Sequence, residues 1–514
     1  MSGGVKPAGG EGDEAYATLR NNAGAIRAIT SAVEGTLGPK GLDTMLVGPR
    51  GEVIITNDGV TILEQMDVTH PAARLLIQVA RSQQEQIGDG TTTATVLAGA
   101  IVAEGTAQVT RGVPVAKVVR GVQEGVAAGL RMLAKRARLL EGLEDPQLYS
   151  IAYVAGRENE DLARLVIEGA KKLGLPKMRD PQFRFSDTIV SHSRARNEVW
   201  PGLLIQKRPA NAQPDFPPDS ARVLLFQDAF EPESVHDEAL MTDSGFQKQM
   251  QLREQFRSLL PKLVELQVGF IASDRGVDPE AEQFCTDHGI MVLQRISRAD
   301  LRRIADYTGA RPLRRTGLGK PAEELAGYLG YAGHVSYDER LESVRMGEGK
   351  GRAQVTIVVG ASTSEVIGER LRIAKDAASS VQAALRGGCL PGGGSAEAAV
   401  AHELERYRET VQGMEGFGIA AVAEALRRPL AQIVVNAGYN PLEKVEEVKA
   451  AQIATGNDAL AIDCDTGAVT DMAAIGVMDP ADVKLHALQA AGEVAAAILR
   501  IHTVIKMRQP RTEE

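Results

Sequence analysis

The chain has few cysteines and no apolar run long enough to cross a membrane. Both features limit the classes of protein to which it can belong. The three cysteines, Cys285, Cys389 and Cys464, lack the spacing of a metal site or a disulfide framework, so we expect reduced thiols. The longest largely apolar run, 94–103, is about half of what a membrane span requires. Residues 1–12 are small and polar, without the apolar segment of a secretion signal. These features predict a cytoplasmic protein with no membrane partner.

Aromatic residues and positive charge are also scarce. Aromatic side chains make up 4% of the chain and the formal net charge is −9, with no basic block. This composition argues against nucleic acid as a partner. The eight histidines show no HExxH pattern, no Ser–His–Asp or Cys–His set is evident, and no GxxxxGK[ST] phosphate loop occurs. The sequence therefore gives no support to hydrolysis by a metal protease, by a nucleophile triad or by a P-loop enzyme.

What the chain does have is length and strongly helical ends. Its 514 residues exceed what a single core organises and predict several domains. The N-terminal part shows helical patterns at 18–37, 72–86, 92–108 and 114–138, and a β-hairpin pattern at 44–56. From 391 to the end the pattern is again helical and rich in alanine, apart from a turn-rich stretch at 463–467.

The middle of the chain has a different character. Strand-like runs at 223–226, 269–272 and 289–293 alternate with helical runs at 279–288 and 299–308, which predicts an α/β domain. The proline-rich polar stretch 197–219 indicates a boundary. We therefore expect a multi-domain α and α/β protein, in which one helical domain is assembled from both ends of the chain.

Two further helices are predicted in and after this middle part. The segment 245–266 has a helical pattern that Pro261 should kink or restart. After a strand at 355–359, the capping-box pair Ser362 and Glu365 should open a helix that carries Asp376.

The most informative segment is Gly88-Asp89-Gly90-Thr91-Thr92-Thr93, which opens a long apolar helix. The first N–H groups of a helix have no internal partner and bind phosphate well, and glycines let the backbone approach the anion. A carboxylate such as Asp89 suits the Mg²⁺ that accompanies a nucleotide. The segment thus predicts a magnesium–nucleotide site. Its alternative interpretation is a glycine turn capped by threonines.

Five more segments favour the nucleotide site over the capped glycine turn. They are Gly35-Thr36-Leu37-Gly38-Pro39-Lys40-Gly41, Asn57-Asp58-Gly59-Val60-Thr61, Arg370-Leu371-Arg372-Ile373-Ala374-Lys375-Asp376-Ala377, Pro391-Gly392-Gly393-Gly394 and Val477-Met478-Asp479-Pro480. In this order and spacing, together with the glycine–threonine segment, they resemble the nucleotide-site segments of the chaperonins, which are double-ring, ATP-driven folding machines. The resemblance extends from about residue 15 to about residue 506.

The resemblance implies the chaperonin fold. That fold has a mainly α-helical equatorial domain, a small α/β intermediate domain and an α/β apical domain with a helical protrusion. In this chain the equatorial domain would comprise 1–139 and 387–514, and the intermediate domain 140–202 and 355–386. The apical domain would comprise 203–354, with the protrusion at about 231–266.

It also implies ATP and Mg²⁺ as cofactors, with K⁺ as a further candidate, and a role for each matching residue. Asp89 would bind Mg²⁺, and Asp58 and Asp376 would orient and activate the attacking water. The remaining nucleotide contacts would come from Leu37, Gly38, Pro39, Gly59, Gly88, Gly90, Thr91, Thr92, Thr93, Gly393, Gly394 and Asp479.

Four of these residues have ordinary structural alternatives. Asp58 suits an Asp-Gly turn, and Asp376 a solvated helix position beside Lys375. Gly38 suits a helix C-cap, and Asp479 a helix N-cap.

The apical protrusion distinguishes the types of chaperonin. A helical extension at this point resembles the built-in lid of the archaeal and eukaryotic cytosolic type, group II. The candidate lid and client-binding residues are Ala239, Leu240, Met241, Phe246, Met250 and Phe256. The alternative for this stretch is an ordinary apical helix. The lysine that the archaeal type uses to sense the γ-phosphate is not evident, and Arg157 is the nearest basic residue. Together with weak similarity at 179–218, this suggests the divergent bacterial branch, group III.

The resemblance implies unfolded client proteins and further copies of the chain as partners. We expect stacked rings with eight subunits each and no separate co-chaperonin. The hairpin at 44–56 would add a strand to the terminal run 504–507 of a neighbour. The alternatives are a chaperonin that needs a separate lid, a scaffold that holds clients but has lost ATPase activity, and a phosphotransferase. Retention of Asp58, Asp89 and Asp376 counts against the inactive scaffold.

Overall fold

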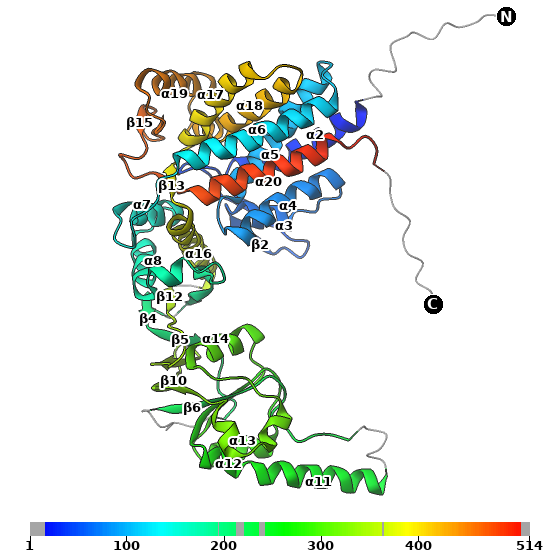
Figure 1. Cartoon of the computed structure of the whole chain (residues 1–514), viewed down its shortest axis with the longest axis vertical. Coiled ribbons are helices and arrows are strands. Elements are labelled where there is room, and N and C mark those ends of the chain that lie inside the picture. Colours follow the sequence, from blue (N-terminus) through cyan, green and yellow to red (C-terminus); the bar gives the residue numbers. More distant parts are fainter. Residues whose placement is uncertain (1–15, 194, 212–219, 236–241, 362–363, 505–514) are drawn as a thin grey trace, which may run out of the picture. The chain divides into compact units, whose positions relative to one another are not determined.

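The computed structural model describes residues 16–193, 195–211, 220–235, 242–361 and 364–504. Contacts divide the chain into two compact units. The first unit takes Met1–Ile167, Leu175–Ser186 and Arg372–Glu514, and the second takes Glu168–Gly174 and Asp187–Leu371. The first unit is therefore built from both ends of the chain, whose blue and red helices lie side by side in Figure 1. The division into equatorial, intermediate and apical domains stays a prediction.

The first unit packs around one almost wholly buried helix, α5 (Thr91–Thr110). Apart from Glu104 and Gln108 its residues are apolar, small or threonine, which is the pattern of a helix enclosed by others. The helices that contact it most come from early and late parts of the chain: α2 (Ala17–Glu34), α4 (Pro71–Gln86), α18 (Glu415–Asn436) and α20 (Ala481–Leu499). The N-terminus of α5 carries the threonine run, so this core fixes the position of the candidate phosphate site.

The other elements of the first unit surround this core. The helices are α3 (Gly59–Gln65), α6 (Val115–Arg136), α7 (Pro146–Ala155), α9 (Leu175–Met178), α17 (Ser395–Thr410), α19 (Pro441–Thr455) and the part of α16 (Ser364–Gly387) from Arg372 onward. The strands form antiparallel pairs: β1 (Thr44–Val47) with β2 (Val53–Thr56), β13 (Cys389–Pro391) with β16 (Met478–Pro480), and β14 (Leu460–Ile462) with β15 (Val469–Asp471). The β1–β2 hairpin confirms the strands predicted at its two ends. Helix α8 (Glu160–Leu173) continues from the first unit into the second.

The second unit contains three sheets. The largest has the order β8 (Met291–Leu293), β7 (Val268–Ser273), β6 (Ala221–Phe226), β9 (Gly330–Ala332), in which the first three strands are parallel. Strands β6, β7 and β8 are almost fully buried, since helices cover a parallel sheet on both faces. The smaller sheets have the orders β10 (His334–Asp338), β11 (Ser343–Gly347), β5 (Gly202–Ile205), and β3 (Ile189–His192), β12 (Thr356–Gly360), β4 (Glu198–Trp200).

The helices of the second unit include those expected from the alternating pattern. They are α11 (Asp243–Leu259), α12 (Pro261–Glu265), α13 (Pro279–Asp287), α14 (Arg298–Thr308) and α15 (Ala322–Ala326), with short 3₁₀ turns η1 (Phe185–Thr188) and η2 (Arg315–Gly319), the first of which spans the border between the units. Helix α11 ends before Pro261 and α12 begins there, which confirms the predicted restart.

One sequence prediction is wrong in part and another lies outside the described residues. The stretch 197–219 was expected to be a polar boundary, but β4 and the fully buried β5 occupy its first third. Four consecutive buried residues in β5 belong to a sheet covered on both faces, a pattern that the surrounding prolines obscure. The capping-box residue Ser362 lies outside the described residues.

Candidate nucleotide site

The glycines at the start of α5 are required by the backbone. Gly88 and Gly90 have φ of +85° and +79°, a left-handed conformation that residues with a side chain rarely adopt. A Cβ at Gly90 would lie 2.5 Å from Cγ1 of Val483, and one at Gly88 2.4 Å from Oγ of Ser379. Gly90 is the N-cap residue of α5 and makes no side-chain cap. The first N–H groups of the helix therefore remain available to an anion.

Asp89 is held between the loop and α16. Its Oδ1 accepts a hydrogen bond of 2.6 Å from the N–H of Gly90, and its Oδ2 accepts one from the hydroxyl of Ser380. Burial raises the pKa of the Asp89 carboxyl, although both hydrogen bonds act in the opposite direction. A partly buried carboxylate held in this position is suited to binding a cation.

Gln83 holds the same loop in place, a role that no motif in the sequence indicates. Its buried side-chain amide donates to the carbonyl oxygens of Asp89, at 2.7 Å, and Val483, at 3.2 Å. Its amide oxygen lies 2.7 Å from Nδ1 of His486, and burial lowers the pKa of that imidazole. Because an amide oxygen only accepts, the neutral His486 donates from Nδ1. The loop is therefore anchored to α20.

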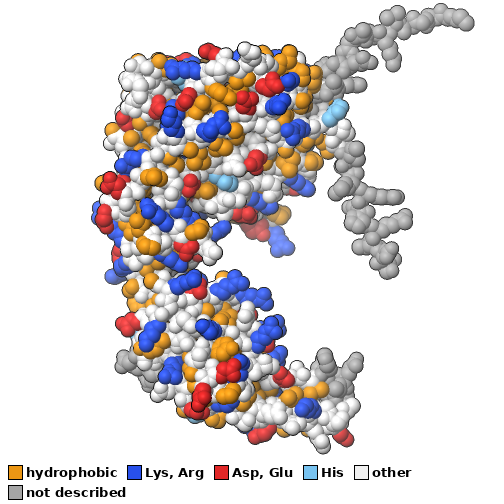
Figure 2. All heavy atoms as spheres, viewed as in Figure 1, with side chains coloured by type: hydrophobic (Ala, Val, Ile, Leu, Met, Phe, Trp, Pro, Cys, Tyr) orange, Lys and Arg blue, Asp and Glu red, His pale blue; other side chains and the backbone are white. Residues whose placement is uncertain are grey.

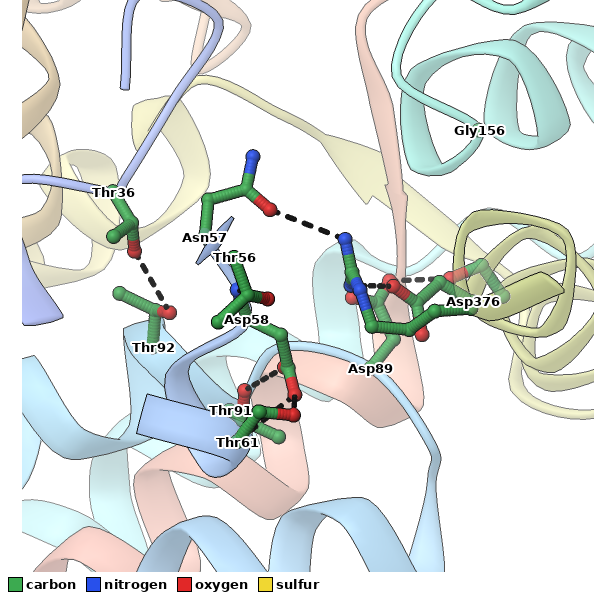
Figure 3. A network of polar contacts seen from close by, with 12 residues as sticks. Thr36, Thr56, Asn57, Asp58, Thr61, Asp89, Thr91, Thr92, Gly156 and Asp376 are labelled. Carbon is green, nitrogen blue, oxygen red and sulfur yellow. Dashed lines mark hydrogen bonds and ion pairs between the residues drawn. The ribbon is translucent and has the colours of Figure 1, made fainter. Parts of the chain in front are cut away.

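Asp58 is the N-cap of α3, in place of the Asp-Gly turn that its sequence context allowed. Its Oδ2 accepts from the N–H of Thr61 at 3.0 Å and from the Thr61 hydroxyl at 2.5 Å. Its Oδ1 lies 3.5 Å from Oγ1 of Thr91, so the aspartate also reaches the start of α5 (Figure 3). These contacts fix the carboxylate beside the candidate phosphate site.

Asp376 is enclosed beside the other two carboxylates, unlike the solvated helix position that its sequence context allows. Only 18% of its side chain is exposed. Burial raises the pKa of the Asp376 carboxyl well above its ordinary value, and the negative charges of Asp89 and Asp58 raise it further. The fold therefore places three aspartates from distant parts of the chain close enough to act on each other electrically (Figure 3).

Two arginines offset this negative charge. Arg372 donates to Oδ2 of Asp376 at 2.7 Å and to Oδ1 of Asn57 at 3.1 Å, so it links α16 to the segment before Asp58. Its position four residues before Asp376 on one helix is the only signal in the sequence that suggests the pairing. The charge of Arg157 lowers the pKa of both Asp89 and Asp376. Arg157 follows Gly156, the C-cap residue of α7, and has a positive φ of +53°.

The threonines and the β2–α3 connection complete this side of the site. Thr92 Oγ1 lies 3.4 Å from Oγ1 of Thr36, in the segment that precedes Leu37, Gly38 and Pro39. A Cβ at Gly59 would lie 2.6 Å from Oγ1 of Thr92, so glycine is needed there for close approach. Thr93 is the third residue of α5.

The segment of Leu37, Gly38 and Pro39 is attached to α18. Asn436 donates to the carbonyl oxygen of Leu37 at 2.8 Å. Gly38 has φ of +84°, and a Cβ there would lie 3.0 Å from Cγ1 of Ile433. The C-cap of α2 is Gly35 and not Gly38, so the helix ends earlier than the sequence suggested.

On the opposite side, Asp479 lies beside the glycine turn. Gly393 and Gly394 have φ of +63° and +78° and lead into α17. Asp479 lies on β16, opposite Leu390 of β13, and its Oδ2 is 2.8 Å from Nζ of Lys484. The N-cap of α20 is Pro480 and forms no side-chain cap, so Asp479 does not have the capping role that the sequence allowed.

The site fits a magnesium–nucleotide complex. An uncapped helix N-terminus and glycine turns supply N–H groups and close approach, while three partly buried carboxylates offer oxygen ligands for a divalent cation. Among the described residues no group of three or more His, Cys, Asp or Glu side chains forms a metal cage. This arrangement is a candidate nucleotide site whose phosphate-binding segment is not a P-loop.

Comparisons with known proteins identify the family. The model of the TCP-1/cpn60 chaperonin family matches residues 29–509, so the chain belongs to this family. Its function is that of an ATP-dependent, group II-like chaperonin, and its enzymatic activity is ATP hydrolysis.

Individual relatives agree with this assignment. The chain is 31% identical to thermosome subunit alpha of Thermoplasma acidophilum, covering 95% of this chain and 92% of that one. It is also 31% identical to the thermosome subunit of Pyrococcus abyssi, covering 98% and 94%. A solved structure described as a group III chaperonin in the open state has a TM-score of 0.86 and 42% identity, covering 96% of this chain and 100% of the other. Both the group II likeness and the group III branch suggested by the sequence are thus supported.

Proposed function

We propose that the protein hydrolyses Mg-ATP at the site formed by Asp58, Asp89, Asp376 and the N-terminus of α5, and that hydrolysis closes its own lid over an unfolded client. The convergence of the three carboxylates at an uncapped helix N-terminus carries this proposal. Phosphoryl transfer to water needs the phosphate charge neutralised and a water held in line with the bond that breaks.

Each group has a proposed task. Asp89 holds Mg²⁺, which neutralises phosphate charge when it is bound, and the N–H and hydroxyl groups of Thr91–Thr93 bind phosphate oxygens. Asp58 and Asp376 accept hydrogen bonds from the attacking water and receive its proton. Arg157 or Arg372 supplies the positive charge at the γ-phosphate. A K⁺ ion is a further candidate cofactor.

The position of Asp376 would also couple ATP hydrolysis to movement of α16. It lies on α16, which continues from the first unit into the second, whereas Asp58 and Asp89 lie on loops of the first unit. If Asp376 must be seated for hydrolysis, movement of α16 opens or completes the site, and ATP turnover is coupled to movement of the chain.

The lid proposal rests on α11 of the second unit. Phe246 and Met250 are 60% and 54% exposed on this helix, which suits contact with unfolded chains or with neighbouring lids. Phe256 differs from the expectation, because it is 9% exposed and packs edge-on against Phe230, with the ring planes at 65°. It therefore supports α11 from within the core and is not offered as a client contact. The candidates Ala239, Leu240 and Met241 lie outside the described residues.

Ring assembly is proposed through the β1–β2 hairpin. On the face drawn in Figure 2, hydrophobic and charged side chains are interspersed over both units. The hairpin is different, because most of its apolar residues are exposed: Met45 60%, Val47 68%, Val53 54%, Ile54 40% and Ile55 57%. A two-stranded ribbon with apolar side chains and open edges suits pairing with a strand of a second copy. Most of the run 504–507, the proposed strand, lies outside the described residues.

The partners and location follow from the same proposal. We propose unfolded proteins as clients, two stacked rings with eight subunits each, action in the cytoplasm, and no separate co-chaperonin. No described helix has the length and apolar character needed to cross a membrane.

Refolding of a chemically denatured enzyme with Mg-ATP and no co-chaperonin tests the proposal. We expect activity to be recovered with the protein and lost with Asp376→Asn, which keeps the shape of the side chain but cannot accept the proton. Capture of the client without release would contradict the built-in lid, and recovery with the variant would contradict the role of Asp376.

A further inference from the structure

A buried three-charge cluster adjoins the candidate ribose side of the site. Nζ of Lys484 lies 2.7 Å and 2.8 Å from the two carboxylate oxygens of Glu397, and 2.8 Å from Oδ2 of Asp479. Lys484 and Glu397 are 5% and 3% exposed, whereas Asp479 is 32% exposed. The cluster therefore has two members in the core and one at the surface.

The geometry leaves one carboxylate oxygen of Asp479 available. An ammonium group has three N–H donors, and the two Glu397 oxygens and Oδ2 of Asp479 take all three. Within the described residues no donor contacts Oδ1 of Asp479. A carboxylate oxygen held in this way accepts hydrogen bonds from the hydroxyl groups of a sugar.

The position of Asp479 also constrains the glycine turn. A Cβ at Gly392 would lie 3.3 Å from Cγ of Asp479 and 2.9 Å from Cγ1 of Val477. The turn therefore passes so close to Asp479 and Val477 that a side chain at position 392 would crowd both. Three elements meet here: Glu397 lies in the first turn of α17, Asp479 on β16, and Lys484 in the first turn of α20.

Burial of these charges is costly, so the pair needs a physical reason. Two apolar residues of similar volume would pack between α17 and α20 without the desolvation penalty of a buried ion pair. What an apolar pair would lack is a cation reaching Asp479 on the adjacent strand. The one feature that distinguishes the ion pair is thus its fixed contact with a carboxylate at the site.

We propose that Lys484, anchored by Glu397, is a positioning residue that fixes Asp479 to select the ribose hydroxyls of the bound nucleotide. The inference rests on the proposed function, since it takes Asp479 as a nucleotide contact. It assigns Lys484 a role in nucleotide selectivity and none in the chemical step, which predicts changes in KM without changes in kcat.

The test compares ATP with 2′-deoxy-ATP and 3′-deoxy-ATP as ATPase substrates of the assembled protein. In the wild type, loss of a hydrogen bond to a charged acceptor should raise KM for at least one deoxy analogue by about ten- to a hundredfold. The variant Lys484→Met/Glu397→Gln removes both buried charges. It keeps Asp479 but removes the contact of this carboxylate with the lysine. We expect its KM for ATP to rise to that for the deoxy analogue, with kcat within about twofold of the wild type.

Matched variants make the result decisive. Asp479→Asn should abolish the same preference. The double variant Lys117→Met/Glu415→Gln, which removes a lysine–glutamate pair of 2.8 Å between α6 and α18, should keep it. If Lys484→Met/Glu397→Gln does not assemble, Lys484→Arg takes its place, because the longer planar guanidinium displaces the Asp479 carboxylate while keeping the charge.

The outcomes separate this inference from the proposed function. Full preference in a folded Lys484 variant would show that the pair is structural only and would overturn the inference. Full preference in Asp479→Asn would overturn it as well, since nothing would be positioned, while leaving ATP hydrolysis intact. Absence of ATPase activity in the wild type would instead overturn the proposed function itself.

Discussion

Replacement of Arg372 by methionine should slow ATP hydrolysis by about ten- to a hundredfold near neutral pH. The arginine donates to Asp376 at 2.7 Å and to Asn57 at 3.1 Å, and it is the largest factor that lowers the raised pKa of the buried Asp376 carboxyl. A hydrogen bond to a charged group contributes about 1.5–3 kcal/mol, and about 1.4 kcal/mol corresponds to a factor of ten. Methionine keeps the length and helix propensity of the side chain.

The ionisation of Asp376 determines how the rate of ATP hydrolysis should change with pH. Asp376 must be ionised to accept a proton from water, and loss of Arg372 favours its protonated form. Asp58 and Asp89 also favour that form, while Arg157 opposes it. Activity should therefore rise with pH in both proteins, with the rising limb of the variant at higher pH. The deficit should be largest in acid and should shrink toward alkaline pH.

The assay is single-turnover ATP hydrolysis between about pH 6 and about pH 9, which isolates the chemical step from product release. The control is Arg370→Met, which removes an arginine on the same helix that donates to the carbonyl oxygen of Gly360 at 2.9 Å. We expect the control to hydrolyse ATP at the wild-type rate. Undiminished activity of Arg372→Met at neutral pH, or a deficit that does not change with pH, would refute the reasoning.

Three further predictions concern the loop, the buried carboxyls and the hairpin. Gly90→Ala should weaken nucleotide binding at least tenfold by calorimetry, because its Cβ meets Val483 at 2.5 Å, whereas Gly438→Ala, with an equally positive φ and open space, should bind normally. Asp376→Asn should raise the melting temperature of the nucleotide-free protein at pH 8 but not at pH 4. A carboxyl group whose pKa is raised in the folded state stabilises the fold at pH values below its ordinary pKa. This stabilisation is lost as the pH rises through the raised pKa. Met45→Thr/Ile55→Thr should sediment as monomers with an unchanged melting temperature, since both side chains are more than half exposed; intact rings would contradict the hairpin's role.

Much of the fold was predictable because its signals are local. The β1–β2 hairpin follows from two strand-like runs around a glycine–proline turn, and the start of α5 from glycines and hydroxyls within a few residues. Helix α11 and its restart at Pro261 follow from one proline. Strand β5 was not predicted, because four buried residues in a row match a strand or a helix equally and only the sheet decides.

The candidate site was predictable in its members but not in its supports. Asp58, Asp89 and Asp376 were identified through the resemblance, since no local pattern says that residues so far apart will meet. The residues that support the site from neighbouring helices were not predicted. Gln83 and Lys484 are ordinary polar residues of helical segments, and only packing against α20 or α17 buries them and gives them partners. Nothing short of the tertiary structure reveals such contacts.

The assembly of the first unit from both ends of the chain has a consequence for its synthesis. Helix α5 is complete at Thr110, but α18, which covers it, begins only at Glu415. At roughly 5–20 residues per second, the ribosome needs on the order of 15–60 s to supply that cover. During this interval α2 and α4 can pack on α5, but the mostly apolar faces that α18 and α20 later cover have no partner. A subunit whose task is to shelter unfinished proteins thus passes through the same exposed condition itself each time it is translated.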